Sequence, residues 1–145
     1  VQVGQGYVAV AAGLSHTLAL KADGSLWAWG NNLSGQLGVS TASTFQPAPV
    51  QVGAGYRSVA AGYSHSVALK ADGTLWAWGA NDRGQIGSTG GGTTPQQIGE
   101  GFAAISAHGN HNLAIKLDGS LWAWGDNNYN QLGMGNRIYM FHNLH

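Results

Sequence analysis

The chain has 145 residues and a mass of 15.0 kDa, which is the size of one ordinary domain. Of its 145 residues 24 are glycine, far above the usual glycine share of about 7%. Charged residues make up 8% of the chain, against a usual share of about 25%. A net charge of zero with 43% hydrophobic residues excludes a disordered chain, and it excludes a protein that binds nucleic acid or membranes through a basic surface. The absence of Cys excludes disulfides and thiolate metal sites. No apolar run approaches the ~20 residues that span a bilayer, and no signal peptide is expected. These exclusions leave a Gly-rich, turn-rich β-domain.

A ten-residue segment occurs three times in the chain. KADGSLWAWG at 21–30 recurs as KADGTLWAWG at 70–79 and as KLDGSLWAWG at 116–125. The similarity extends upstream to a Ser-His or Asn-His pair and downstream to a GQLG segment. It predicts a single repeat domain over 1–145, with repeat one at 1–48, repeat two at 49–94, repeat three at 95–135 and an unmatched tail at 136–145.

Each repeat predicts four short strands. In the first repeat these are VQV at 1–3, VAVAA at 8–12, HTLAL at 16–20 and LWAW at 26–29. The two Trp of the last strand are two residues apart, so both point to one face while Leu26 and Ala28 point to the other. Apolar side chains on both faces indicate stacked sheets. We therefore predict an all-β fold of three four-stranded antiparallel β-propeller blades; a β-solenoid is the alternative, although its repeats are usually shorter.

The turns carry their own signals. Asp-Gly pairs predict hairpins with positive φ at Gly24, Gly73 and Gly119, and turn chemistry explains the preceding carboxylates Asp23, Asp72 and Asp118. The Asn residues after each WG pair are expected to cap the turn into GQLG. The third repeat departs from the pattern, since His108 replaces a turn glycine and Asn130 replaces the first glycine of GQLG. His and Asn tolerate positive φ, so these turns are expected to survive with some strain.

The combined pattern of VAxGxxH, KxDGxLWAWG, GQLG and a following Pro resembles the repeat of the regulator of chromosome condensation family. All three repeats match it, over residues 1–135. The LWAWG segment is more similar to bacterial members, which include propeller-type β-lactamase inhibitor proteins. The resemblance implies a propeller, normally of seven blades, that binds other proteins through its face loops.

Three histidines, His16, His65 and His111, occupy equivalent positions. Because equivalent positions in radial blades converge on a central channel, a metal site is one interpretation. The other is that each ring bonds a backbone group of its own turn. Exact repetition favours this structural interpretation, so we expect no metal, and an alanine at any of the three should lower the free energy of unfolding by roughly 1–3 kcal/mol.

Six tryptophans also follow the repeat: Trp27, Trp29, Trp76, Trp78, Trp122 and Trp124. They are either stacking platforms for sugars, as in lectin propellers, or large side chains that fill the space between blades. Their strict repetition favours the structural interpretation, with at most one of each pair reachable by a ligand.

No catalytic constellation is visible in the sequence. The carboxylates outside the repeat, Asp82, Glu100 and Asp126, are scattered, and no Ser lies in a nucleophile elbow. No Gly-rich loop leads into a helix. We therefore expect no enzyme activity and no cofactor.

Positions that differ between repeats are better candidates for a binding site, because the scaffold does not dictate them. The set comprises Leu33, Tyr63, Asp82, Arg83, Asn128 and Tyr129, together with the loops 39–48 and 88–94. They indicate a non-enzymatic protein-protein interaction module. The alternatives are a carbohydrate-binding propeller, or a propeller fragment or engineered blade set with no independent function. Guanine-nucleotide exchange is disfavoured, and no specific residue supports β-lactamase inhibition.

Three blades are fewer than the four to eight that typically close a propeller. The open ends of such an arc would expose large apolar residues. The apolar tail residues 138–141 are too short for a fourth blade and are expected to supply a closing strand or to shield one face. We therefore expect a homodimer that closes a six-blade ring, with a larger ring or a partner-completed propeller as alternatives. A secreted or cell-surface bacterial location is favoured over the cytoplasm.

Overall fold

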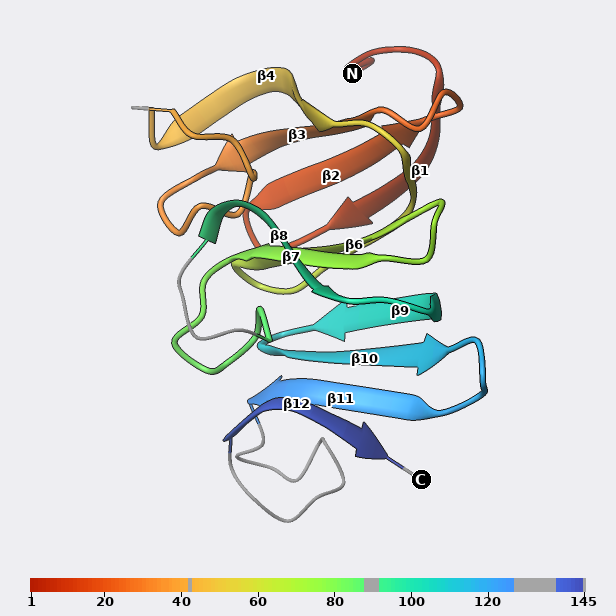
Figure 1. Cartoon of the computed structure of the whole chain (residues 1–145). Coiled ribbons are helices and arrows are strands. Elements are labelled where there is room, and N and C mark those ends of the chain that lie inside the picture. Colours follow the sequence, from red (N-terminus) through yellow and green to blue (C-terminus); the bar gives the residue numbers. More distant parts are fainter. Residues whose placement is uncertain (42, 88–91, 127–137, 145) are drawn as a thin grey trace.

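The computed structural model describes residues 1–41, 43–87, 92–126 and 138–144, and it consists of β-structure (Figure 1). Its strands form three four-stranded sheets, and consecutive strands within each sheet pair antiparallel. The predicted all-β class with three four-stranded blades is therefore confirmed. No helix able to cross a membrane occurs among these residues.

The three sheets, called here the first, second and third blade, follow one another along the chain. The first blade contains β1 (Tyr7–Ala12), β2 (His16–Lys21), β3 (Leu26–Asn31) and β4 (Phe45–Gly53). The second contains β5 (Tyr56–Ala61), β6 (His65–Lys70), β7 (Leu75–Gly79) and β8 (Gly92–Gly99). The third contains β9 (Phe102–His108), β10 (His111–Lys116), β11 (Leu121–Asp126) and β12 (Ile138–Leu144). Figure 1 shows the blades stacked in this order, and β5 contacts both β1 and β9.

The blades do not begin where the predicted strand order puts them. The PVQV segment was expected to open the second repeat's sheet, but it lies in β4 and pairs with β3, as the outer strand of the first blade. The equivalent segment of the next repeat lies in β8 and pairs with β7. Proline is compatible with this place, because an outer strand needs no donor on its free edge. Each sheet is thus displaced by one strand from the sequence repeat.

The two ends of the chain also differ from expectation. Residues 1–3, predicted as a strand by their similarity to PVQV, form none. The tail, which matched nothing in the repeat, contributes β12, which pairs antiparallel with β11. It completes the third blade as its fourth strand.

Two apolar layers hold the blades together. Between the first and second blades, Leu18, Leu20 and Leu26 pack in one cluster with Trp78. Between the second and third blades, a cluster of the same design contains Leu69 and Trp124. Both of these Trp are completely buried, whereas Trp29, their equivalent on the first blade, is only half-buried. The Trp faces of the second and third blades therefore each pack against the Leu face of the blade before them.

In each blade, the hairpin between the second and third strands is closed by a short series of hydrogen bonds. In the second blade, the carboxylate of Asp72 accepts hydrogen bonds from Thr74 N at 3.0 Å and Thr74 Oγ1 at 2.6 Å. Thr74 Oγ1 in turn accepts one from Trp76 Nε1 at 2.8 Å. The hydrogen bonds from Thr74 hold the pKa of Asp72 below its usual value. The expected positive φ is present at Gly73, at 86°.

A lysine is held between two aromatic rings beside each of these hairpins. Lys70 Nζ lies 4.2 Å from the ring centroid of Trp76 and 5.1 Å from that of Tyr56. Lys21 and Lys116 have the same arrangement in the other blades. Because the rings attract a cation with their π-faces, this arrangement links the hairpin to the strand that enters the blade.

We expect Lys70→Met to lower the free energy of unfolding by about 1 kcal/mol, because methionine keeps much of the apolar stem but loses the cation–π attraction. Urea denaturation measures the change. Lys70→Arg is the matched control, since it keeps the charge over the rings and should retain most of the stability. Equal destabilisation by Met and Arg would assign the effect to packing of the stem.

Candidate functional site

Polar side chains bridge consecutive blades on the side of the molecule where β2 and β6 begin. His16 Nε2 lies 3.0 Å from Ser66 Oγ of the second blade, and Ser66 Oγ donates to the main-chain oxygen of Gln36 at 2.7 Å. Trp78 Nε1 donates to the same oxygen at 2.9 Å. The loop after β3 of the first blade is thereby attached to the second blade by two donors.

The same bridge recurs between the second and third blades. His65 Nε2 lies 2.7 Å from Asn112 Oδ1, and Asn112 Nδ2 donates to the main-chain oxygen of Gln85 at 2.6 Å. Trp124 Nε1 donates to that oxygen at 3.0 Å. Each histidine was expected to bond its own turn, but these two rings bond the following blade instead.

The bridges determine the protonation of both rings. Ser66 gives its hydroxyl proton to Gln36, so it accepts one from His16 Nε2, and the carbonyl oxygen of Asn112 can only accept from His65 Nε2. Nε2 therefore carries a proton in both rings, and both Nδ1 atoms are buried without a hydrogen-bond partner. Burial lowers the pKa of each of these two histidines to about 4, because the charged form loses its hydration.

A repeated glycine, three residues before each of these histidines, provides space for the ring. Neither Gly13 nor Gly62 has a positive φ. Instead, a Cβ on Gly62 would overlap the ring of His65 and lie 2.6 Å from the main-chain oxygen of Gly109. The expectation that this position needs a glycine for its φ is therefore wrong.

His108 occupies the same position in the third blade, and it has a Cβ. His111 accordingly differs from the other two histidines: its ring is only half-buried and packs edge-on against His108, with 6.5 Å between centroids. Asn130, the other departure of the third repeat, lies outside the described residues. Within the described ranges, no group of three His, Asp or Glu side chains is arranged to hold a metal ion.

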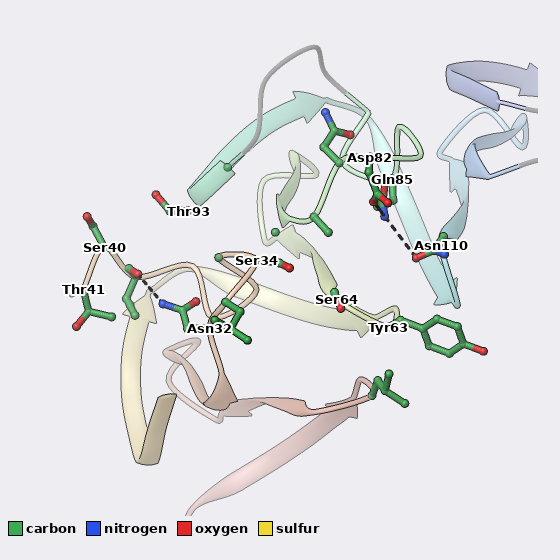
Figure 2. A pocket seen from close by; sticks show the side chains of 18 residues that line it. Asn32, Ser34, Ser40, Thr41, Tyr63, Ser64, Asp82, Gln85, Thr93 and Asn110 are labelled. Atoms are coloured by element: carbon green, nitrogen blue, oxygen red, sulfur yellow. Dashed lines mark hydrogen bonds between the residues drawn. The ribbon is translucent and has the colours of Figure 1, made fainter. Parts of the chain in front are cut away.

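A cleft of about 720 Å³ opens at this end of the molecule, over the first and second blades (Figure 2). Its walls are the β1–β2 and β5–β6 turns and the loops that follow β3 and β7. Its lining residues are Leu14, Asn32, Leu33, Ser34, Gly35, Val39, Ser40, Thr41, Tyr63, Ser64, Gly79, Ala80, Asn81, Asp82, Gln85, Gly92, Thr93 and Asn110.

Asparagine and glutamine side chains hold the loops around this cleft. Asn31 Oδ1 accepts from Leu33 N at 2.7 Å, and Asn32 Oδ1 accepts from Leu37 N at 3.1 Å. In the second blade, Gln85 Nε2 donates to Asp82 Oδ1 at 3.0 Å and to Asn110 Oδ1 of the third blade at 3.4 Å. Figure 2 shows Gln85 and Asn110 joined in this way. The walls are thus held by the repeat scaffold.

The chemistry of the lining is that of a hydrogen-bonding surface. Hydroxyl and amide groups from Asn32, Ser34, Ser64 and Thr93 line it, as Figure 2 shows. Asp82 is the single charged side chain among the described lining residues. Large exposed side chains stand at its rim, since Leu14 and Leu33 are each 72% exposed.

The structure brings three of the six predicted binding residues to the cleft: Leu33, Tyr63 and Asp82. Tyr63 is 46% exposed, and in Figure 2 its ring extends away from the other labelled side chains. Arg83 does not line the cleft; its main-chain N donates to Gln85 Oε1 at 2.6 Å. Asn128 and Tyr129 lie outside the described residues.

Several lining residues were missed individually. Ser40, Thr41 and Thr93 fall in the predicted variable loops, but Ser64 and Asn110 were treated as scaffold because they precede the repeated histidines. The sequence did contain a sign of their variability, since the residue before the repeated histidine is Ser in two repeats and Asn in the third.

None of the six tryptophans lines the cleft. Trp27, Trp76 and Trp122 are half-buried at the opposite, hairpin end of the blades, where each contacts a lysine. Trp78 and Trp124 are inaccessible between blades. Only the first blade leaves both members of its pair partly exposed.

Solved structures with similar folds are found in eukaryotes. Yeast RCC1 (Prp20), solved bound to Kap60, is 25% identical with a TM-score of 0.84, and the alignment covers 94% of this chain and 36% of that one. Human WBSCR16 is also 25% identical with a TM-score of 0.84, over 96% of this chain and 39% of that one. This chain therefore spans well under half the length of these two proteins. No curated protein sequence matches it.

Family models agree with the structural likeness. The regulator of chromosome condensation (RCC1) repeat matches three times, at residues 7–36, 56–85 and 102–131. A second model of the same repeat matches 23–69 and 72–115. Each of these three matches begins at the first strand of a blade and extends past the end of its third strand. The chain belongs to the regulator of chromosome condensation (RCC1) repeat family.

Proposed function

We propose that this chain is a non-enzymatic protein-binding module, and that its cleft over the first and second blades receives a loop of the partner protein. One observation carries the proposal: residues that differ between repeats gather around one cleft, while the strands beneath them are nearly identical. Binding function is usually placed in loops on a rigid scaffold in this way.

The composition of the cleft indicates what kind of loop it would bind. Exposed Leu14 and Leu33 offer apolar contact area at the rim, and exposed Tyr63 is of a residue type that is enriched at interface hot spots. The interior offers hydroxyl and amide groups suited to a peptide backbone. Asp82 would pair with a Lys or Arg of the partner, because it is the one charge in the described lining.

Similar proteins support protein binding as a class. The yeast RCC1 structure contains Kap60, and a further structure of yeast Prp20p, 20% identical with a TM-score of 0.67, is described together with binding to Gsp1p and histones. Binding by this chain is a proposal, since the likeness concerns three blades of a longer propeller.

The test is selection of peptides from a displayed library of constrained loops on the immobilised chain. Peptides selected by the wild type should bind the triple variant Leu33→Ala, Tyr63→Ala, Asp82→Ala at least tenfold more weakly. Val8→Ala with Leu117→Ala is the matched control, because these exposed side chains lie outside the cleft and their loss should not change the affinity. Equal binding to the wild type and the triple variant would contradict the proposal.

A glycan array separates the carbohydrate alternative. Reproducible binding of one sugar class, lost in the same triple variant, would replace protein binding as the main activity. Turnover of a substrate that disappears with Asp82→Ala or Asp126→Ala would show that the chain is an enzyme.

We also propose that a second copy of the chain is a partner, in a homodimer that closes a six-blade ring. The support is that, among the described residues, no blade packs on the Trp face of the first blade or on the Leu face of the third. Val10 is 70% exposed on the first blade, while its equivalents Val59 and Ile105 pack into the two interior layers. Ile115 is 44% exposed on the third blade, while its equivalents Leu20 and Leu69 are buried.

A further inference from the structure

The two interfaces inside the chain consist of the same pairs of groups. In each, a main-chain N of the later blade's first strand donates to a hairpin glycine of the earlier blade: Tyr56 N to Gly24 O and Phe102 N to Gly73 O, both at 3.1 Å. At the other end, the earlier turn donates to the later one: Leu14 N to Tyr63 O at 3.2 Å and Tyr63 N to Gly109 O at 2.8 Å. Every blade therefore carries one half of the pattern on each face.

One half of this pattern remains at each end of the stack. The equivalents of the donor Tyr56 N and the acceptor Tyr63 O are Tyr7 N and Leu14 O, on the first blade. The equivalents of the acceptor Gly24 O and the donor Leu14 N are Gly119 O and Gly109 N, on the third blade. If the first blade of one copy followed the third blade of another, Tyr7 N would therefore face Gly119 O. At the opposite end of the strands, Gly109 N would face Leu14 O.

The third blade presents the complementary apolar surface. A hollow of about 180 Å³ lies on it, lined mainly by apolar side chains that include Leu113, Ile115 and Leu121. These three are the equivalents of Leu18, Leu20 and Leu26, which pack with Trp78 in the interior layer. The hollow therefore lies where a Trp of a following blade would pack.

We infer that the first blade of one copy docks head-to-tail on the third blade of a second copy, with Trp29 filling this hollow. This docking rests on the proposed homodimer, and it names the residues through which the two copies would make contact. It does not require His111 to reproduce the bridges of His16 and His65, because His108 keeps that ring from their position. The occupant is a second copy, since the contact continues an interface that the chain already forms twice.

Complementation between two single variants tests the head-to-tail geometry. Val10→Glu and Ile115→Lys each place a charge on one of the two exposed faces, and each variant should fold, because the wild-type side chains are exposed. By sedimentation equilibrium, wild type should have twice the monomer mass of 15.0 kDa, and each variant alone should remain monomeric. An equimolar mixture should regain dimers, because the wild-type face of each variant is available to the other.

Three results would overturn the inference: a wild-type monomer at high micromolar concentration, dimers of either charged variant alone, or no dimers in the mixture. The peptide-selection experiment on the cleft is read separately, because its variants lie on neither end face. A failed docking with intact peptide binding leaves the protein-binding proposal in place.

Discussion

Gly62→Ala is expected to cost about 3 kcal/mol of unfolding free energy, because its Cβ has no space. The added carbon would overlap the ring of His65 and lie 2.6 Å from the main-chain oxygen of Gly109. That oxygen accepts the hydrogen bond from Tyr63 N which joins the second and third blades. Relief therefore requires loss of the His65 bridge, separation of the two turns, or both. Urea denaturation monitored by Trp fluorescence measures the cost.

Gly53→Ala is the matched control. It also lacks a positive φ, and its nearest contact is a side-chain carbon of Tyr56 at 3.2 Å, which needs to move by only a few tenths of an ångström. We expect a change below about 1 kcal/mol there. Gly62→Ala in a His65→Ala background should cost less than in the wild type, because the ring overlap is gone while the contact with Gly109 remains. Wild-type stability of Gly62→Ala would refute this account of the turn.

The stability of the chain is expected to fall steeply between pH 6.5 and about 4. His16 and His65 have folded-state pKa values lowered to about 4 by burial, against an ordinary value of 6.5. In this interval the unfolded chain binds more protons than the folded one, so stability is fully present above 6.5 and is lost as the pH falls. At 1.36 kcal/mol per pKa unit, each histidine contributes on the order of 3 kcal/mol.

Replacement of the two histidines tests the assignment. The double variant His16→Asn, His65→Asn should be less stable at pH 7, yet it should lose most of the pH dependence between 6.5 and 4. The hairpin carboxylates act at lower pH: hydrogen bonds lower the pKa of Asp23, Asp72 and Asp118, so their contribution is lost as the pH falls below the ordinary value of 3.8. An unchanged slope in the double variant would assign the acid sensitivity to other groups.

The hairpins of this protein were predictable from the sequence, because their determinants are local. An Asp, a Gly and a Ser or Thr within three positions supply the positive φ and the bonds that close each turn, and two Trp at i and i+2 must share one face. Repetition then indicated stacked sheets, since one face of each strand needed a neighbour. The variable loops were recognised as binding candidates by the same comparison of repeats.

The boundary of each sheet was decided by the tertiary structure. A repeat has a period but no starting point, so PVQV could belong equally to the sheet before it or the sheet after it. Pairing with β3 settled the choice, and β12 completes the third blade with a sequence that does not resemble the repeat. Backbone hydrogen bonds define an outer strand, and many sequences can make them.

The histidine bridges and the cleft also depended on contacts between blades. His16 meets Ser66 at a separation of 50 residues, and His65 meets Asn112 at 47, so no local pattern could show that the rings bond the next blade. Gly62 is a glycine because it lies against the ring of His65 and because the main-chain oxygen of Gly109 reaches it once the blades stack. The sequence by itself determined the strands, the turns and the need for stacking; the tertiary structure alone decided which groups meet between blades, because those contacts join residues about one repeat apart.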